Sequence, residues 1–521
     1  MIRDRDLPPL LEKILRSYFS VLTDDEKARL LSDLASRPDL AGLTGPEIVG
    51  VALNTLGVTG RKIAQVLSVH KGLLPERYRN SLLGSKDRAR DINKSVAFDI
   101  LADRVDRIDR ESSPRFGDPS VGDELDALAV KALPDVSLPA RGRLLRQVRY
   151  LLNEGKRRLS RIESIGTELG SGSIKVAYKL TLDDGKVWVA KIRVPGAQEG
   201  VQREFEILNT VVDNLEDVLR DDAGLEAAQA RQILDEVRGL VASEMRFQDE
   251  AAKESAMVER LGRRSWLARK LAGGEPFVPR PHPLYVDEDV LLEEFAPAVR
   301  FADLPRRSMI GPSQARIARL AAAESVFSMV YDDWLEPDPH AGNRMARRAG
   351  WLDRLRTKLV LIDLGQGHAQ KIERLKPFLK SALALEGGDA ASATSHLIGI
   401  LNVPRGKDAD VRAAVEGGFA SAQTDGLMER LMSGLLAAET AGALVRPEYA
   451  SLQKTFLHLT DEYAPLLPRN FLVSAMERAL AARILRDRAM SPASLAKLSW
   501  KRLIRGRAAV SRELEAVIDR L

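Results

Sequence analysis

The residues of this 521-residue chain best suited to chemistry lie in a short loop rich in proline and glycine. The loop reads Glu336-Pro-Asp338-Pro-His-Ala-Gly-Asn343, which places an aspartate and an asparagine five positions apart. This spacing matches the D-x-x-x-x-N loop of enzymes that transfer phosphoryl groups. We therefore predict that Asp338 is catalytic and orients or deprotonates an attacking hydroxyl or water, and that Asn343 is a metal ligand.

A second carboxylate follows 20 residues after Asn343, in the sequence Leu359-Val-Leu-Ile-Asp363-Leu-Gly365. The apolar run predicts a buried strand, and Asp363 stands where that strand ends. Carboxylate and amide oxygens are hard ligands that suit Mg²⁺. Asp363 and Asn343 are therefore predicted to hold one divalent metal ion.

A glycine-rich turn lies upstream, between two predicted strands. Glycine has no side chain, so backbone N–H groups can approach phosphates closely in such a turn. The G-x-G-x-x-G pattern is incomplete because Lys175 replaces its third glycine, and the same residues could form an ordinary hairpin turn. As ATP-binding candidates the turn supplies Gly170, Ser171, Gly172 and Ser173.

Lys191 lies in the apolar sequence Val-Ala-Lys-Ile, 21 residues after Gly170, which resembles the V-A-I-K strand of kinases. A lysine inside a buried strand needs an anionic partner, because an unpaired buried charge is very costly. The acidic helix around Glu250 could supply that partner. We predict Lys191 as a catalytic and ATP-binding lysine paired with Glu250. The alternative is a lysine on the solvent face of the strand.

Hydrophobic patterning predicts the elements that must position these residues. Three short strands are expected from Ile165, with a hairpin signal at Asp184-Gly185, and long helices are expected from Gln198 to Leu261. A strand pair follows between Pro281 and Phe295, and from Pro312 onward the pattern is helical except for one strand, Lys358–Ile362. This order predicts an α+β, bilobal protein-kinase-like fold. Its parts are a small antiparallel-sheet N-lobe, a helical C-lobe and an N-terminal helical extension.

The same pattern divides the chain into three parts. We expect an N-terminal helical extension over residues 1–160 and an N-lobe over 161–300, with a long insertion before the Glu250 helix. Residues 301–521 then form the helical C-lobe, with the catalytic loop and the Asp-Leu-Gly motif. Backbone groups at Glu294 and Phe295, where the last N-lobe strand ends, are expected to contact adenine.

Composition excludes several kinds of site. The chain has no cysteine and only six histidines, which rules out disulfides and cysteine-ligated metals. A net charge of +5 is weak for this length, so no nucleic-acid partner is expected. No apolar run approaches the roughly 20 residues of a spanning helix, and the N-terminus does not read as a signal peptide. We expect a cytoplasmic or peripheral membrane protein.

One basic segment, Lys497–Arg507, combines positive charge with Trp500 and Leu503. Such a segment could lie on an anionic lipid surface, which makes a lipid or membrane surface a candidate partner. The alternative is a solvated terminal helix that packs through its apolar residues.

With these residues placed, the chain resembles the UbiB (AarF/ADCK) family of atypical kinases over residues 45–480. The family's D-P-H-P-G-N loop is similar to the segment from Asp338 to Asn343, and its K-x-G-Q motif to Lys62-Ile-Ala-Gln65. The family's E-x-D and E-A-A pieces are similar to Glu244-Met-Arg246 and Glu250-Ala-Ala252.

The resemblance implies ATP and Mg²⁺ as cofactors, and an ATP- and Mg-dependent atypical kinase or ATPase of the UbiB type. The γ-phosphate would be hydrolysed or transferred to an unknown acceptor. The alternative is a nucleotide-binding regulatory pseudokinase that supports isoprenoid-lipid or quinone metabolism, or a partner protein, without phosphoryl transfer.

The family also implies a gate, because its K-x-G-Q and E-x-D motifs are thought to meet over the site. The gating candidates are Lys62, Gln65 and Glu244, which could also be plain helix-surface residues. The chain departs from both motifs at Ala64 and Arg246, and an arginine cannot accept a hydrogen bond from Lys62. A rewired or loosened gate is therefore expected. A basic insert, Arg344–Lys358, is expected to lengthen the link before Asp363.

Overall fold

The structure is a computed structural model, and the description below is confined to part of the chain. Gln65, Gly172, Ser173 and the segment from Leu498 to Arg507 lie outside the described residues, so the predictions made for them stay untested. The described ranges are 7–35, 44–55, 59–60, 62–64, 77–78, 97, 100–101, 162–171, 174–182, 185–223, 227–308, 312–348, 357–423, 425–497 and 511–521.

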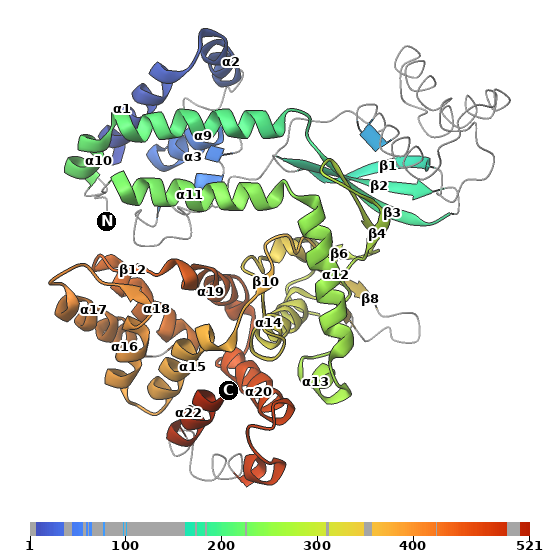
Figure 1. Ribbon diagram of the computed structural model, residues 1–521, viewed down its shortest axis with the longest axis vertical. Helices are drawn as coiled ribbons and strands as arrows, with labels where there is room; N and C mark the ends of the chain where they lie inside the picture. The colour runs from blue at the N-terminus through green and yellow to red at the C-terminus, as the bar shows by residue number, and fades with distance from the viewer. Residues whose placement is uncertain are drawn as a thin grey trace.

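A five-stranded antiparallel sheet forms the N-lobe, with strand order β1-β2-β3-β5-β4 (Figure 1). Side chains of β2 alternate between half-buried and buried, as the apolar–polar alternation predicted. The hairpin turn between β2 and β3 contains Gly185 with φ of 77°, a conformation that glycine adopts without strain. The strands are β1 (Ile162–Ser171), β2 (Lys175–Leu182), β3 (Val187–Arg193), β4 (Pro281–Val286) and β5 (Val290–Glu294).

The helix α12 (Phe247–Arg263) packs against β4 and β5 and joins the sheet to the helical half of the molecule (Figure 1). Its buried side follows helical spacing, and Phe247 and Ala251 pack against Leu291 of β5. A short helix, α13 (Trp266–Leu271), follows it. The first half of α12 packs against the sheet, whereas Met257 and Leu261 of its second half pack in the core of the helical half, so the helix holds its side chains in a fixed register between the two.

The N-terminal helices and the insertion between β3 and α12 form one apolar core. Tyr18 and Leu22 of the N-terminal part pack in the same cluster as Phe205, Leu234 and Val237 of the insertion. Helices α9 and α11 lie side by side and extend away from the sheet (Figure 1). The helices are α1 (Leu7–Val21), α2 (Asp24–Ala35), α3 (Gly45–Thr55), α9 (Ala197–Asn214), α10 (Glu216–Ala223) and α11 (Ala227–Glu244).

Thr44 and Glu47 form the start of α3. The backbone N–H of Thr44 donates to Glu47 at 2.7 Å and its hydroxyl to the same carboxylate at 2.6 Å, a capping arrangement at the start of α3.

The C-lobe is built around α14 (Gln314–Tyr331), which is buried along most of its length. Such a helix is apolar on most sides because neighbours cover it on most sides. The surrounding helices are α15 (Ile372–Glu386), α16 (Ala390–Ile398), α17 (Asp408–Ser421), α18 (Leu427–Thr440), α19 (Pro447–His458), α20 (Phe471–Arg486) and α22 (Ser511–Arg520). Short helical turns are η2 (Phe301–Asp303), η3 (Ala341–Asn343), the π-turn η4 (Leu459–Tyr463) and η5 (Ala464–Leu466).

The expectation of a single strand after Pro312 is wrong. The basic insert does not simply lengthen a loop, because its start, Arg344–Arg348, is strand β8 and pairs with β9 (Thr357–Leu361). This strand contains three arginines in five residues, so it lacks the apolar alternation by which a strand is recognised in a sequence. The other strands here are β6 (Val299–Arg300), which pairs with β8, and the two-residue pairs β7 (Trp334–Leu335) with β10 (His368–Ala369) and β11 (Leu401–Asn402) with β12 (Leu444–Val445).

The architecture is α+β, with an antiparallel sheet in the N-lobe and a helical C-terminal region, as predicted for a kinase-like fold. Among the helices that the structure describes, none combines the length and the apolar character needed to cross a bilayer.

Candidate functional site

The strand register brings Lys191 onto one face of the sheet with an acidic residue of the next strand. Lys191 lies opposite Leu291, and Val189 lies opposite Glu293, so Lys191 and Glu293 share a face. The ammonium Nζ of Lys191 is 2.7 Å from Glu250 Oε1 and 2.8 Å from Glu293 Oε2. The predicted pairing of Lys191 with Glu250 is thus present in the geometry, and a second carboxylate joins it.

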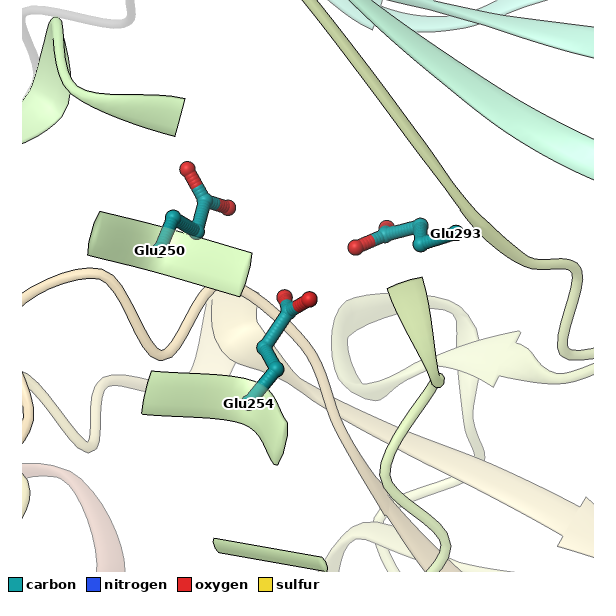
Figure 2. A group of neighbouring side chains, drawn as sticks. All are labelled: Glu250, Glu254 and Glu293. Atoms are coloured by element: carbon teal, nitrogen blue, oxygen red, sulfur yellow. The ribbon is translucent and has the colours of Figure 1, made fainter. Parts of the chain in front are cut away.

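A third carboxylate, Glu254, lies one helical turn after Glu250 on α12, with an oxygen 3.6 Å from Lys191 Nζ. Figure 2 shows Glu250 and Glu254 on α12 with Glu293 reaching toward them from β5. Although burial opposes the charge on Lys191, Glu250, Glu293 and Glu254 together raise its pKa well above the ordinary value. Burial, and then the neighbouring Glu293 carboxylate, raise the pKa of Glu254 well above its usual range. This upward shift favours the protonated acid, which lowers the repulsion within the cluster.

Lys175 also reaches into the site, from the first position of β2. Its Nζ lies 3.0 Å from Glu250 Oε2 and 3.1 Å from Asp363 Oδ1. Glu250 therefore divides its two carboxylate oxygens between Lys191 and Lys175. The lysine that breaks the glycine pattern in the sequence is thus part of the site.

Asp363 follows β9 with φ of 57°, a left-handed conformation that is uncommon for an aspartate. Burial alone would raise the pKa of Asp363, but Lys175 and Lys191 hold it well below the usual range. The next turn is tied to α12, because Lys253 Nζ donates a short hydrogen bond to the carbonyl of Gly365. The helix that supplies Glu250 therefore also fixes the segment that carries Asp363.

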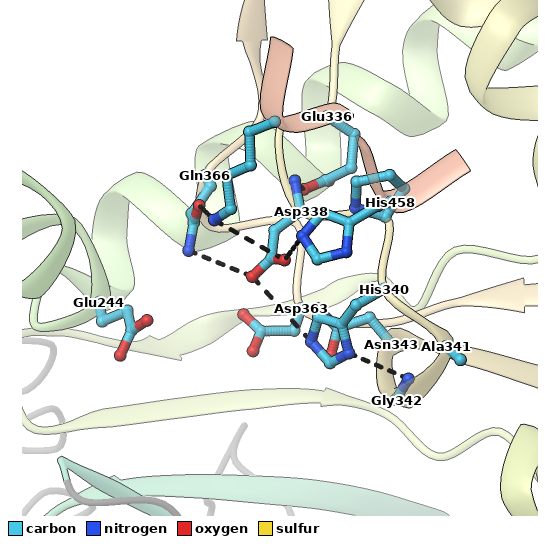
Figure 3. A network of polar contacts seen from close by, with 12 residues as sticks. Glu244, Glu336, Asp338, His340, Ala341, Gly342, Asn343, Asp363, Gln366 and His458 are labelled. Carbon is cyan, nitrogen blue, oxygen red and sulfur yellow. Dashed lines mark hydrogen bonds and ion pairs between the residues drawn. The ribbon is translucent and has the colours of Figure 1, made fainter. Parts of the chain in front are cut away.

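The pairing of β8 with β9 brings Asn343 to Asp363. Arg344 pairs with Leu361, and the N–H of Ile362 donates to the carbonyl of Asn343 at 3.2 Å. Figure 3 shows the side chains of Asp363 and Asn343 in one neighbourhood beside His340. A carboxylate and an amide oxygen in this arrangement fit the hard donor set that Mg²⁺ prefers.

The loop from Asp338 to Asn343 is held in place by residues of η4. The N–H of Ala341 donates to Glu462 Oε2 at 2.6 Å, and the hydroxyl of Tyr463 donates to the carbonyl of Pro339 at 2.5 Å. These two residues lie more than a hundred positions along the chain from the loop. The loop conformation therefore depends on the C-terminal helices.

His340 serves the loop itself. Its Nδ1 accepts a hydrogen bond from the N–H of Gly342 at 3.0 Å. A Cβ atom at position 342 would stand 2.6 Å from the His340 ring, so glycine is required there. This contact gives the histidine a supporting role in the loop.

Asp338 is surrounded by basic side chains. Its Oδ1 lies 3.1 Å from His458 Nε2 and 3.7 Å from Lys454 Nζ, and its Oδ2 lies 4.0 Å from His340 Nε2 (Figure 3). Gln366 Nε2 is 3.5 Å from the same carboxylate. Burial would raise the pKa of Asp338, but these neighbours, Lys454 first, hold it well below its usual range.

His458 joins Asp338 to Glu462, since its Nδ1 lies 2.6 Å from Glu462 Oε1. Burial opposes a charged ring, yet the contacts with Asp338 and Glu462 raise the pKa of His458 to about 9. Glu336, two residues before Asp338, accepts its N–H at 3.3 Å, and burial raises the pKa of Glu336 to about 7. Asp338 is thus ionised at physiological pH, and the cationic groups beside it balance its negative charge. The pKa of Glu336, by contrast, lies near physiological pH.

The hinge candidates lie at the end of β5, with their backbone N–H groups already bonded. The N–H of Glu294 donates to the carbonyl of Arg280 at 2.9 Å, and that of Phe295 donates to the carbonyl of Val187 at 3.4 Å. A hydrogen bond to adenine from these two residues would therefore use their carbonyl oxygens.

The gating candidates are partly described. Lys62 Nζ lies 2.6 Å from Glu244 Oε1, with both side chains largely buried. Arg246 turns away, donating to the carbonyl of Ala242 at 3.2 Å and pairing with Asp249 at 3.2 Å. Arg246 therefore points away from Lys62. The contact between Lys62 of the N-terminal part and α11 is made through Glu244.

The glycine turn is described at Gly170 and Ser171 only. Among the residues that the structure describes, no atom lies within 4 Å of where a Cβ of Gly170 would stand. The backbone on that side would leave room for the phosphate that the sequence analysis expects there, and this expectation stays a prediction.

Sequence reasoning missed several residues that the structure brings to the site. The replacement of the third glycine was a usable signal for Lys175, and the spacing of four from Glu250 was one for Glu254. His458 and Lys454 carried no local signal, because they come from α19, far along the chain from Asp338. The missed residues are Lys175, Glu254, Glu293, Lys454 and His458.

Comparison with known proteins gives a family match for part of the chain. Residues 162–397 match the family profile described as the ABC1 atypical kinase-like domain. A solved structure described as the complex of Rv3197 with erythromycin from Mycobacterium tuberculosis is similar at 15% sequence identity and a TM-score of 0.36, covering 86% of this chain and 99% of that chain. No curated protein matches the chain. The matched segment contains Lys191, Glu250, Asp338 and Asp363, and this part of the chain is similar to an atypical kinase-like domain, as the resemblance to the UbiB family predicted.

Proposed function

We propose that the chain binds ATP together with Mg²⁺ and hydrolyses or transfers the γ-phosphate. The observation that carries this proposal is the chain of contacts from Lys191 through Glu250 and Lys175 to Asp363. These contacts bring together a lysine from a strand, a glutamate from a helix and an aspartate that would bind the metal, although the three are distant in sequence. This is the set of groups that phosphoryl transfer uses.

The chain's own residues would divide the work as follows. Lys191, positioned by Glu250, would face the α- and β-phosphates. The backbone at Gly170, which has no side chain in the way, would approach the same phosphates. Asp363 and Asn343 would hold Mg²⁺, which neutralises phosphate charge when bound. Asp338 would accept a hydrogen bond from the attacking hydroxyl or water and orient it. Positioning and charge neutralisation are most of what this reaction needs.

The proposal is tested with Asp363→Asn, which removes a metal-ligand charge at nearly constant volume. We expect Mg-dependent release of labelled phosphate from γ-labelled ATP to fall about a hundredfold or more, because the metal loses its carboxylate ligand. Asp410→Asn, at an exposed position on α17, is the matched control and should keep its activity. Undiminished hydrolysis by Asp363→Asn would contradict the assignment.

A nucleotide-binding regulator without transfer is the second candidate, and one observation favours it. The carboxylate of Asp338 is already neutralised by His458 and Lys454, which makes it a weak base. In that case ATP should raise the melting temperature, because it binds only the folded chain, and no turnover should follow.

The phosphoryl acceptor can be sought by incubating the chain with γ-labelled ATP and cell extract, and then separating labelled protein, labelled small molecules and free phosphate. Label in a lipid fraction would connect the chain to isoprenoid-lipid or quinone metabolism. Label in free phosphate alone would assign an ATPase.

A further inference from the structure

Two lysines reach the site, and they differ in how many carboxylates hold them. The Nζ of Lys191 has Glu250, Glu293 and Glu254 within 3.6 Å, and its side chain is 8% exposed. Removing this ammonium would take from Glu293 and Glu254 the cation that they contact and would leave Glu250 with Lys175 alone, which is strongly unfavourable for buried acids. Lys191 is therefore needed where it is, whether or not a nucleotide is bound.

Lys175 is held differently. It shares the face of the sheet with Lys191, because Ala177 lies opposite Lys191 and Lys175 lies two residues before Ala177 on the same strand. Its side chain is 18% exposed, more than that of Lys191, and one of its two partners is Asp363. Glu250, its other partner, keeps Lys191 at its second oxygen. Lys175 can therefore leave its partners without exposing an unpaired charge cluster.

Asp363 links Lys175 to the nucleotide. The carboxylate that Lys175 contacts at 3.1 Å is the one that would coordinate Mg²⁺. Two cations compete for that oxygen, so coordination of the metal by Asp363 weakens its bond to Lys175. An ammonium released beside a metal-bound phosphate group finds its new partner in a phosphate oxygen, which accepts charge-assisted hydrogen bonds.

We propose that Lys175 is a phosphate-binding residue that takes a nucleotide phosphate as its partner when Asp363 takes the metal, while Lys191 chiefly neutralises the acidic cluster of Glu250, Glu254 and Glu293. This inference rests on the proposed function, since it names the residue that recognises the phosphates in that same site. It assigns a role to the lysine that replaces a loop glycine, a position where a side chain is otherwise expected to obstruct phosphate.

The inference is tested first by measuring binding of adenosine, ADP and ATP with Mg²⁺ to the full chain. Lys175→Met keeps the length of the side chain and removes its charge. We expect its affinity for ATP to fall about tenfold or more, and its affinity for adenosine to stay unchanged, because only phosphates contact the lysine. Lys175→Arg should retain most of the ATP affinity. Lys186→Met, at the exposed turn between β2 and β3, is the control that should bind as the unmodified chain does.

The alternative role for Lys175 is a lock that merely occupies Asp363. Removing a lock frees the aspartate, so Lys175→Met would then bind ATP with equal or greater affinity, and that result overturns the inference. A parallel loss of adenosine affinity also overturns it, because it would show a general disturbance of the site. If the unmodified chain binds no ATP with Mg²⁺, the proposed function itself fails, and this inference fails with it.

A second measurement requires no variant. An ATP analogue that carries an acyl phosphate transfers its acyl group to a lysine amine beside the phosphates, with the nucleotide phosphate as leaving group. Mass spectrometry of the labelled, unmodified chain then identifies the lysine. We expect the label mainly on Lys175, and protection by excess ATP. Label on Lys191 with none on Lys175 contradicts the inference.

Discussion

Single residues around Asp338 decide how that carboxylate can act. His458 lies between two acids, Asp338 and Glu462, and the side chains of Lys454 and His340 also lie close to Asp338. The imidazolium therefore neutralises the carboxylate and orients it. An aspartate held in this way is better suited to aligning a hydroxyl than to removing its proton.

The His458 contacts predict a pH dependence of stability. The folded-state pKa of about 9 lies above the ordinary 6.5, so the contacts stabilise the fold fully below about pH 6.5. That contribution is lost as the pH rises through about 9, and it amounts to about 3 kcal/mol at most. We expect the melting temperature to fall between pH 7 and pH 9.5, and to fall less in His458→Gln.

The comparison for this prediction is His396→Gln, which removes a different histidine–glutamate contact, that of His396 with Glu515 at 2.9 Å. Its melting temperature should fall with pH as in the unmodified chain. An equal pH dependence in His458→Gln and the unmodified chain would show that His458 does not hold the proton assigned to it.

At the scale of elements, α12 does more than supply Glu250. It carries Glu250 and Glu254 toward β3, packs Phe247 and Ala251 against β5, and reaches the Asp-Leu-Gly turn through Lys253. The helix therefore sets the distance between Lys191 of the sheet and the segment of the C-lobe that carries Asp363. A movement of α12 would change both parts of the site together.

Lys253→Met tests this coupling. It removes the bond to the Gly365 carbonyl and leaves every carboxylate of the site in place. We expect the affinity for ATP in the presence of Mg²⁺ to fall about threefold to tenfold, because the position of Asp363 is less well fixed. Affinity measured without a divalent metal should not change, and Lys253→Arg should restore part of the loss. Equal losses with and without metal would indicate damage beyond the Asp-Leu-Gly turn.

At the scale of the whole molecule, the N-terminal helices and the β3–α12 insertion are one packed unit (Figure 1). Lys62 of the N-terminal part binds Glu244 at the end of α11, and α12 begins three residues later. Contacts made far from the phosphates can therefore influence the helix that holds Glu250. This connection is a physical route by which the N-terminal part could gate the site.

Tyr18 and Phe19 are neighbours on α1 that test the packing of this unit. Tyr18 is buried at 8% exposure, whereas Phe19 is 38% exposed. We expect Tyr18→Ala to cost about 3 kcal/mol and to speed hydrogen exchange in α9 and α11, while α14 of the C-lobe stays protected. Phe19→Ala should change little, within about 0.5 kcal/mol. Faster exchange in α14 as well would mean that the two halves unfold as one.

The sequence by itself determined the order of the elements and the residues whose chemistry is local. The sheet strands, the insertion, the loop from Asp338 to Asn343 and the strand before Asp363 follow from periodicity and turn residues, which act over short distances. The basic strand β8 was not predicted, because its arginines replace the apolar residues whose alternation indicates a strand.

Only the tertiary structure decided which charges meet. The placement of Lys175 between Glu250 and Asp363, the addition of Glu293 to Lys191, and the approach of His458 to Asp338 depend on strand register and on how α12 and α19 pack. Electrostatic energy depends on the distance between groups in space and on their burial, and neither quantity is written in sequence spacing. The sequence shows which acids and lysines are present, and the packing of helix against sheet decides which of them form ion pairs.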